Sequence, residues 1–119
     1  MREAGSIVAM FKALGDPVRL RLFALITHHD ELCVCHLTEA LSLPQSTVSR
    51  QLGLLRHAGL VQARRDGKWI YYRAGENALP SLQTAIDACA PSALLAEDRN
   101  RLHQVLAPES ASCCNNNNA

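Results

Sequence analysis

The feature that most constrains the fold is a proline-containing break at Ser42–Pro44, which separates two short helical patterns. Proline disfavours helical geometry in the residue before it, so the first helix ends near Leu41 and the second runs from about Gln45 to His57. The second helix has apolar residues every three or four positions and polar residues at its start. Two helices joined by so short a turn predict a helix-turn-helix.

The segment that follows this pattern predicts a β-hairpin. Residues 60–65 and 68–73 are strand-like, and Asp66-Gly67 between them is typical of a tight turn. A hairpin directly after a helix-turn-helix makes a winged helix, so the expected fold is mainly α with a small β-hairpin.

Three further helices are expected, over residues 6–14, 17–28 and 79–106, the last with a possible break at Pro91. The second of them opens with an N-cap, Asp16, followed by Pro17. The N-terminal and C-terminal helices carry apolar stripes, and we expect them to form a helical dimerisation layer against a second copy of the chain.

The length of 119 residues fits a single domain. We expect a DNA-binding and dimerisation domain over residues 1–107 and a flexible, Cys- and Asn-rich tail over residues 108–119. No apolar run reaches the roughly 18 residues that a membrane span needs, and the first residues do not form a secretory signal. A cytoplasmic protein with no membrane partner is therefore expected.

Charge is concentrated in one part of the chain, although the overall net charge is only +1. Residues 44–73 hold six basic residues and one acidic residue, whereas the segments before and after carry net charges of −1 and −3. Such a block predicts a localised anionic partner, nucleic acid first, with a solvated basic face as the alternative.

The chain has five cysteines: Cys33, Cys35, Cys89, Cys113 and Cys114. Their odd number argues for a reducing compartment and against a disulfide framework. The first two form a Cys-x-Cys pair, and soft thiolates favour soft, thiophilic ions over magnesium or calcium. Trivalent arsenic and antimony belong with these soft ions and prefer three sulfur ligands.

Four stretches occur in a familiar order: FKALGDPVRL at 11–20, ELCVCHL at 31–37, STVSRQLGLLRHAGLV at 46–61 and RDGKWIYYR at 65–73. With them the chain resembles the ArsR/SmtB family of bacterial metal- and metalloid-responsive repressors. The Glu-Leu-Cys-Val-Cys-x-Leu segment is typical of the arsenic-responsive branch.

The resemblance implies a homodimeric winged helix-turn-helix protein that binds double-stranded operator DNA and represses an arsenic-resistance operon. Its inducer would be As(III) or Sb(III), held by Cys33 and Cys35, with no permanent cofactor. The operator sequence, the regulated genes and the preference for arsenite or antimonite stay open.

The resemblance is incomplete at one position, because repressors of this branch often have a third cysteine three residues after the second. Here that residue is Thr38, whose hydroxyl is a poor ligand for arsenic. Either two thiolates suffice or the third sulfur comes from Cys113, Cys114 or Cys89, of which Cys89 is better suited to a buried core position.

A geometric argument suggests how the inducer acts. Residues two apart on an α-helix point about 200° apart around its axis. We expect Cys33 and Cys35 in the first turn of the helix that opens the helix-turn-helix, so both can bind one ion only when that turn unwinds or is re-aimed. Unwinding would then move the recognition helix.

The DNA contacts follow from the winged-helix fold. The start of the second helix faces the major groove, so its polar residues are candidates for reading bases, while basic residues of the hairpin would hold phosphates. Ser46 is alternatively an N-cap. The base-reading candidates are Gln45, Ser46, Thr47, Ser49 and Arg50, the phosphate contacts are Arg64, Arg65 and Lys68, and the expected core positions are Val48, Leu52 and Leu55.

An enzyme is not expected, because the chain has no Cys-x-x-Cys and no general base next to a nucleophile. A repressor of the same fold whose thiols sense oxidation or another soft metal stays open. Release of DNA by peroxide instead of arsenite would distinguish it.

Overall fold

A computed structural model of the chain describes residues 4–76, 80–89 and 93–107. The proposed tail, residues 108–119, and the possible break at Pro91 lie outside these ranges. The described elements are α1 (Ala4–Leu14), α2 (Pro17–Ile26), β1 (Leu32–Cys33), α3 (Val34–Leu41), α4 (Gln45–His57), β2 (Val61–Asp66), β3 (Trp69–Ala74), α5 (Pro80–Cys89) and α6 (Ala93–Leu106).

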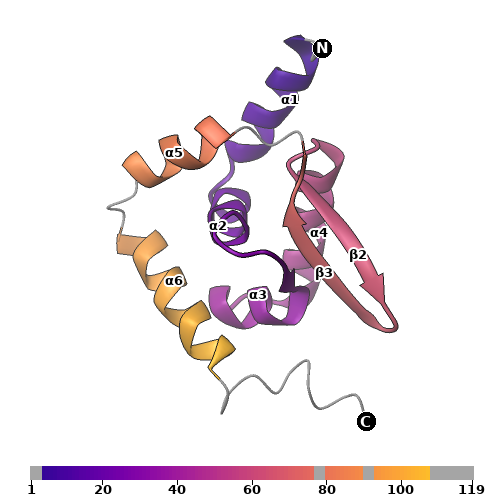
Figure 1. Ribbon diagram of the computed structural model, residues 1–119, viewed down its shortest axis with the longest axis vertical. Helices are drawn as coiled ribbons and strands as arrows, with labels where there is room; N and C mark the ends of the chain where they lie inside the picture. Colours follow the sequence, from indigo (N-terminus) through magenta and orange to yellow (C-terminus); the bar gives the residue numbers. More distant parts are fainter. Residues whose placement is uncertain (1–3, 77–79, 90–92, 108–119) are drawn as a thin grey trace.

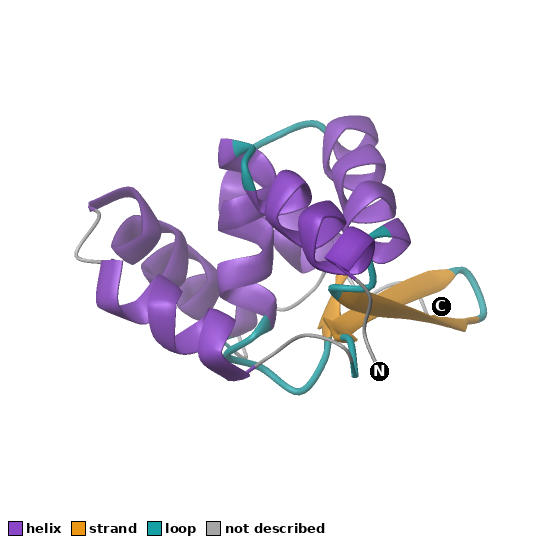
Figure 2. Ribbon diagram, turned by 90° about the horizontal axis from the view of Figure 1, so that it is seen from above, coloured by secondary structure: helices purple, strands orange, loops and turns teal. Residues whose placement is uncertain are grey.

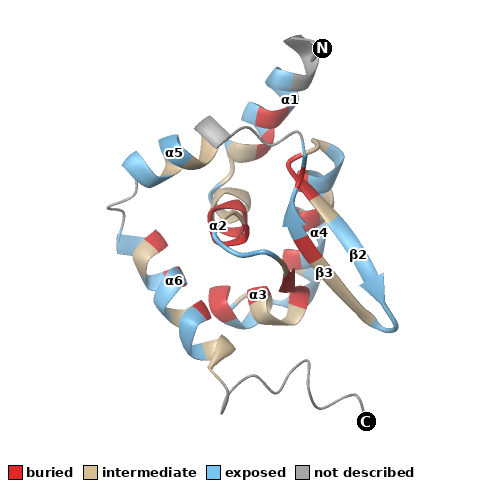
Figure 3. Ribbon diagram, in the orientation of Figure 1, coloured by how far each residue is buried: buried red, intermediate tan, exposed pale blue. Residues whose placement is uncertain are grey.

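Helix α2 lies at the centre of the molecule and the other elements surround it (Figure 1). Five consecutive residues of α2, from Leu22 to Ile26, are buried, which is the expected pattern for a helix enclosed on all sides. The buried residues of α3, α4 and α6 face inward toward it (Figure 3). None of the helices in the described ranges is long and apolar enough to cross a membrane.

Local signals in the sequence place several helix ends correctly. The side chain of Asp16 accepts hydrogen bonds from the amides of Val18 and Arg19 at 3.0 and 3.1 Å, which confirms it as the N-cap of α2. Gly59, at φ 82°, follows the last residues of α4. The helix expected over residues 17–28 is two residues shorter, because the amides of His28 and His29 bond to carbonyls three residues earlier in a turn.

The predicted hairpin is confirmed, and it projects from the helical body as a wing (Figure 2). Gly67, at φ 64°, makes the turn between β2 and β3. The sheet has a third strand that the sequence did not predict, because β1 pairs antiparallel with β3. Two residues are too few to show a strand periodicity.

A buried ion pair joins α2 to α6. Arg21 donates from Nε to Oδ2 of Asp98 at 2.8 Å and from Nη2 to Oδ1 at 2.9 Å, and the Asp98 side chain is only 1% exposed. This hydrogen bonding with Asp98 raises the pKa of the Arg21 guanidinium. A carboxylate so deeply buried is tolerated because both its oxygens are paired.

Replacing Arg21 with methionine keeps an unbranched apolar stem but leaves Asp98 buried without its partner. We expect the Arg21→Met variant to lose about 3–5 kcal/mol of unfolding free energy, measured by urea denaturation at equal protein concentration. The control is Glu97→Gln next to it, because Glu97 is 59% exposed and its ion pair with Arg101 is 3.9 Å long. That variant should change by less than about 1 kcal/mol. Equal losses in the two variants would contradict the assigned role of the buried pair.

Candidate DNA interface and thiol site

The turn between α3 and α4 is short and conformationally defined. Ser42 adopts a left-handed conformation at φ 55° and ends α3. Pro44 is the N-cap of α4, and its carbonyl accepts from the amides of Thr47 and Val48 at 3.1 Å. The alternative expectation that Ser46 caps this helix is therefore wrong, because Ser46 lies inside the first turn.

Helix α4 presents a polar face to solvent and an apolar face to the core. Val48, Leu52 and Leu55 are fully buried, which confirms them as core residues. The base-reading candidates lie on the other side of the helix. Of these, Gln45, Ser46, Ser49 and Arg50 are exposed and Thr47 is half-buried.

One arginine holds α4 in place, and sequence reasoning missed it. Arg19 of α2 donates from Nη1 to Oε1 of Gln51 on α4 at 2.7 Å, and from Nε to the carbonyl of Ala13 at 2.7 Å. The polar face of α4 is thereby positioned relative to α1 and α2. Only the position of Arg19 off the apolar stripe hinted that it had a polar partner.

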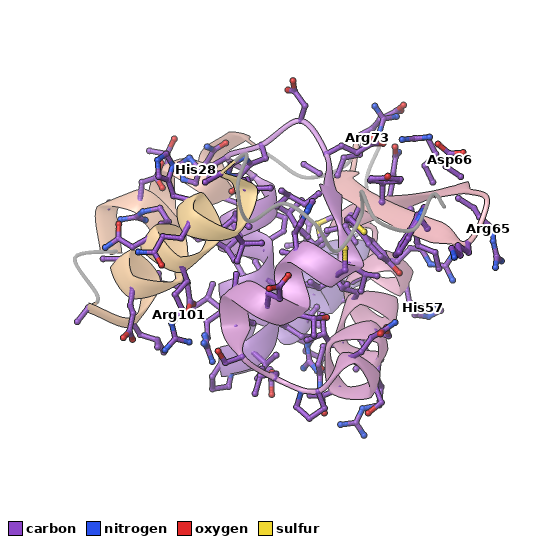
Figure 4. All side chains as sticks on the ribbon, turned by 90° about the horizontal axis from the view of Figure 1, so that it is seen from below. His28, His57, Arg65, Asp66, Arg73 and Arg101 are labelled. Carbon is purple, nitrogen blue, oxygen red and sulfur yellow. The ribbon has the colours of Figure 1, made fainter. Side chains whose placement is uncertain are left out.

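Two of the expected phosphate contacts lie on the exposed wing. Arg65 donates to the carbonyl of Gly67 at 3.1 Å, and Nζ of Lys68 lies 5.6 Å from the centre of the Trp69 ring. Figure 4 shows Arg65 and Asp66 at the end of the wing, away from the helices. Arg65 and Lys68 are both exposed, so an extended polyanion can approach either of them.

The third expected phosphate contact, Arg64, has an acidic partner. It donates from Nε and Nη2 to the two carboxylate oxygens of Glu31 at 2.8 and 2.7 Å, and its guanidinium lies 4.8 Å from the centre of the Tyr71 ring. These hydrogen bonds lower the pKa of Glu31 and raise that of Arg64. The sequence did not predict this pair.

Cys33 and Cys35 form a close pair of thiols. Their Sγ atoms lie 2.9 Å apart, neither cysteine is in a disulfide, and Cys33 is 1% exposed while Cys35 is half-buried. The expectation that a helical turn must unwind to bring them together is wrong. Cys33 precedes α3 in extended backbone, at φ −74° and ψ 145°, so the 200° separation of a regular helix does not apply.

Among the described residues, no third ligand is grouped with the two thiols. Within residues 4–76, 80–89 and 93–107, no three His, Cys, Asp or Glu side chains are grouped to hold a metal ion. The hydroxyl of Thr38 donates to the carbonyl of Val34 at 2.8 Å. The side chain of Cys89 and the whole of Cys113 and Cys114 lie outside the described part of the chain.

His36, next to Cys35, has a buried Nε2 atom without a hydrogen-bond partner among the described residues. Burial lowers the pKa of this imidazole, although Glu39 acts in the opposite direction. His36 is therefore held toward its neutral form beside the thiol pair.

Comparison with protein families gives a match to "Bacterial regulatory protein, arsR family" over residues 16–63. This range contains the thiol pair, the helix-turn-helix and the start of the wing. It leaves α1, the second half of β2, all of β3 and both C-terminal helices outside the match.

Of three similar curated proteins, two are named for arsenic resistance and one for cadmium resistance. The chain is 49% identical over 73 residues to the arsenic resistance transcriptional regulator ArsR1 of Pseudomonas putida, covering 61% of this chain and 57% of that protein. It is 36% identical over 110 residues to the arsenical resistance operon repressor of Escherichia coli, covering 90% and 94%. It is also 37% identical over 70 residues to the cadmium resistance regulatory protein CadC of Listeria innocua, covering 59% of each.

A solved structure has the same architecture. The homodimeric winged helix-turn-helix DNA-binding domain Mb0332 of Mycobacterium bovis, described as a possible ArsR-family regulator, is 31% identical with a TM-score of 0.63. The similarity covers 73% of this chain and 80% of that one. The predicted winged-helix fold is thereby confirmed.

Proposed function

This chain belongs to the ArsR family of bacterial regulatory proteins, and we propose that it represses an arsenic-resistance operon until trivalent arsenic or antimony binds its thiols. Its fold and relatives are those of DNA-binding transcriptional regulators and not of enzymes. The observation that carries the arsenic proposal is the 2.9 Å approach of the Cys33 and Cys35 sulfurs.

DNA recognition is assigned to α4 and the wing. The exposed polar residues at the start of α4 enter the major groove, where Gln45 and Arg50 make bidentate contacts to base edges. Arg65 and Lys68 hold phosphates at the wing and contribute affinity more than sequence preference. Support for this assignment comes from the basic segment, residues 44–73, which contains α4 and all of the wing except its last residue.

The inducer site is assigned to the two thiols, because soft sulfur ligands suit As(III) and Sb(III). Either these two thiolates suffice or a third sulfur comes from Cys113 or Cys114 in the tail. Cys113 is six residues beyond Ala107, and six extended residues span about 20 Å. Helix α6, which leads to the tail, lies beside α3, and Arg101 of α6 donates to the Ser42 hydroxyl at 3.0 Å. Cys89 is the alternative third ligand.

The protein is proposed to act as a homodimer in the cytoplasm. Apolar side chains of α1 and α6 are exposed, among them Phe11 at 61% and Leu94 at 45%. Both contribute to an apolar groove that also contains Leu20, Leu82 and Ile86. A second copy would bury these side chains, as expected for the dimerisation layer.

Replacing either Cys33 or Cys35 with serine should leave operator binding unchanged and abolish release by arsenite, because a hydroxyl is a poor arsenic ligand. The measurement is a mobility shift on the promoter of the protein's own operon, titrated with arsenite. A Cys33→Ser protein that still dissociates on arsenite addition would contradict the assignment.

The same assay tests the third ligand. The double variant Cys113→Ser/Cys114→Ser should need more arsenite for release if the tail supplies a sulfur. Release at the wild-type concentration would instead favour Cys89 or a site of two thiolates.

A second candidate is a repressor of the same fold that senses oxidation or another soft metal through these thiols. The short distance between the two sulfurs favours it, since close thiols can also be oxidised to a disulfide. Release by peroxide or cadmium, without release by arsenite, would support this candidate over the first.

Lys68→Ala and Arg50→Ala should weaken DNA binding in different ways. Loss of Lys68 should weaken binding to all sequences. The slope of log affinity against log salt concentration should fall by about the amount that one phosphate contact contributes. Loss of Arg50 should cost about 1–3 kcal/mol and relax the preference at one base position. Binding measured against salt on operator and unrelated DNA separates the two effects. An unchanged salt slope in Lys68→Ala would argue that the wing does not contact DNA.

A further inference from the structure

The thiol pair is connected to the wing by the sheet itself. Cys33 of β1 is the register partner of Tyr71 on β3, and Tyr71 is the register partner of Arg64 on β2. Directly opposed residues of antiparallel strands share a face of the sheet. Cys33, Tyr71 and Arg64 therefore form one row across all three strands.

The segment that carries Cys33 also contacts the wing through a side chain. Glu31 lies two residues before Cys33 and accepts both hydrogen bonds of the Arg64 guanidinium. That guanidinium lies over Tyr71, the central residue of the row. The short segment from Glu31 to Cys35 thus holds both the thiols and the acidic partner of a wing arginine.

The contact between Glu31 and Arg64 can be exchanged readily. The Arg64 side chain is 52% exposed and that of Glu31 is 29% exposed, so water reaches both. Ion pairs in such surroundings contribute little to stability. A DNA phosphate offers an arginine the same two-oxygen geometry as a carboxylate, and so competes with Glu31 for the same donors.

We propose that Glu31 competes with operator DNA for Arg64, and that inducer bound to Cys33 and Cys35 favours the pairing of Glu31 with Arg64. This inference rests on the proposed function. An ion that joins the two sulfurs binds best when the sulfurs are close together. In the structure the sulfurs are close, and the Glu31 carboxylate accepts hydrogen bonds from Arg64. Because a ligand shifts an equilibrium toward the state that it binds better, the inducer withdraws Arg64 from the phosphate backbone.

The test is the Glu31→Gln variant, compared with Asp66→Asn as a matched control. Asp66 is also acidic and lies 3.9 Å from Arg64, but it is at the end of the wing and has no link to the thiol segment. Each variant removes one negative charge from the surroundings of Arg64. Only Glu31→Gln removes the charge carried by the segment that also holds Cys33 and Cys35.

Binding to a promoter fragment of the protein's own operon is measured with and without sodium arsenite. Without arsenite, Glu31→Gln should bind a few-fold more tightly than wild type, by up to about fivefold for an exposed pair, and more tightly than Asp66→Asn. With arsenite, the weakening of DNA binding should be smaller in Glu31→Gln than in wild type and in Asp66→Asn. Arsenite should still bind the free Glu31→Gln protein, as followed by titration of the remaining thiols, but a few-fold more weakly, because a contact that the inducer favours stabilises the bound inducer in return.

Variants of Arg64 complete the test. Arg64→Ala should also reduce the response to arsenite, and adding Glu31→Gln to it should cause no further reduction, because both changes break the same contact. Equal behaviour of Glu31→Gln and Asp66→Asn in both conditions would overturn the inference, as would additive losses in the double variant.

The outcomes separate this inference from the proposed function. If arsenite releases wild type and Glu31→Gln equally, the arsenic repressor stands and the role of Glu31 falls. If arsenite does not release wild type, the proposed function falls. In that case the DNA affinity of Glu31→Gln without arsenite still tests whether Glu31 competes with DNA for Arg64. If Glu31→Gln binds DNA no more tightly than wild type, the competition is also overturned.

Discussion

The thiol site depends on the pairing of two residues, Leu32 and Cys33, with the central strand of the wing. This pairing keeps Cys33 in extended backbone immediately before α3, and so brings its sulfur to that of Cys35. It also aligns Glu31 with the wing, where both carboxylate oxygens meet Arg64. Cys33 of the proposed inducer site and Arg64 of the proposed DNA interface are therefore neighbours in one sheet, although they are 31 positions apart in the sequence.

Much of the fold could be predicted because its signals are local. The cap at Asp16, the turn before Pro44, the buried positions of α4 and the Asp-Gly hairpin each depend on a few neighbouring residues. Strand β1 could not be predicted, because two residues have no periodicity and the strand exists only through its partner β3. That omission led to the wrong expectation that Cys33 lies in a helix.

The polar contacts between distant segments were also beyond sequence reasoning. Arg21 and Asp98 are 77 positions apart, Arg64 and Glu31 are 33 apart, and Arg19 and Gln51 are 32 apart. Nothing in local pattern distinguishes these residues from solvated charges. The contacts change how the basic segment is interpreted, because Arg64 is one of its six cations and is already paired with an acid from outside it.

In the mechanism that we propose, the inducer acts on the wing through β1 and β3 and not by unwinding α3. Hydrogen exchange of backbone amides, measured with and without arsenite on the full chain, tests this most directly. Exchange should be slower with arsenite in residues 31–33 and 69–74 and unchanged in α4, since the bound ion would hold the thiol segment against the sheet. Faster exchange in the first turn of α3 and in α4, with β1 and β3 unchanged, would contradict it.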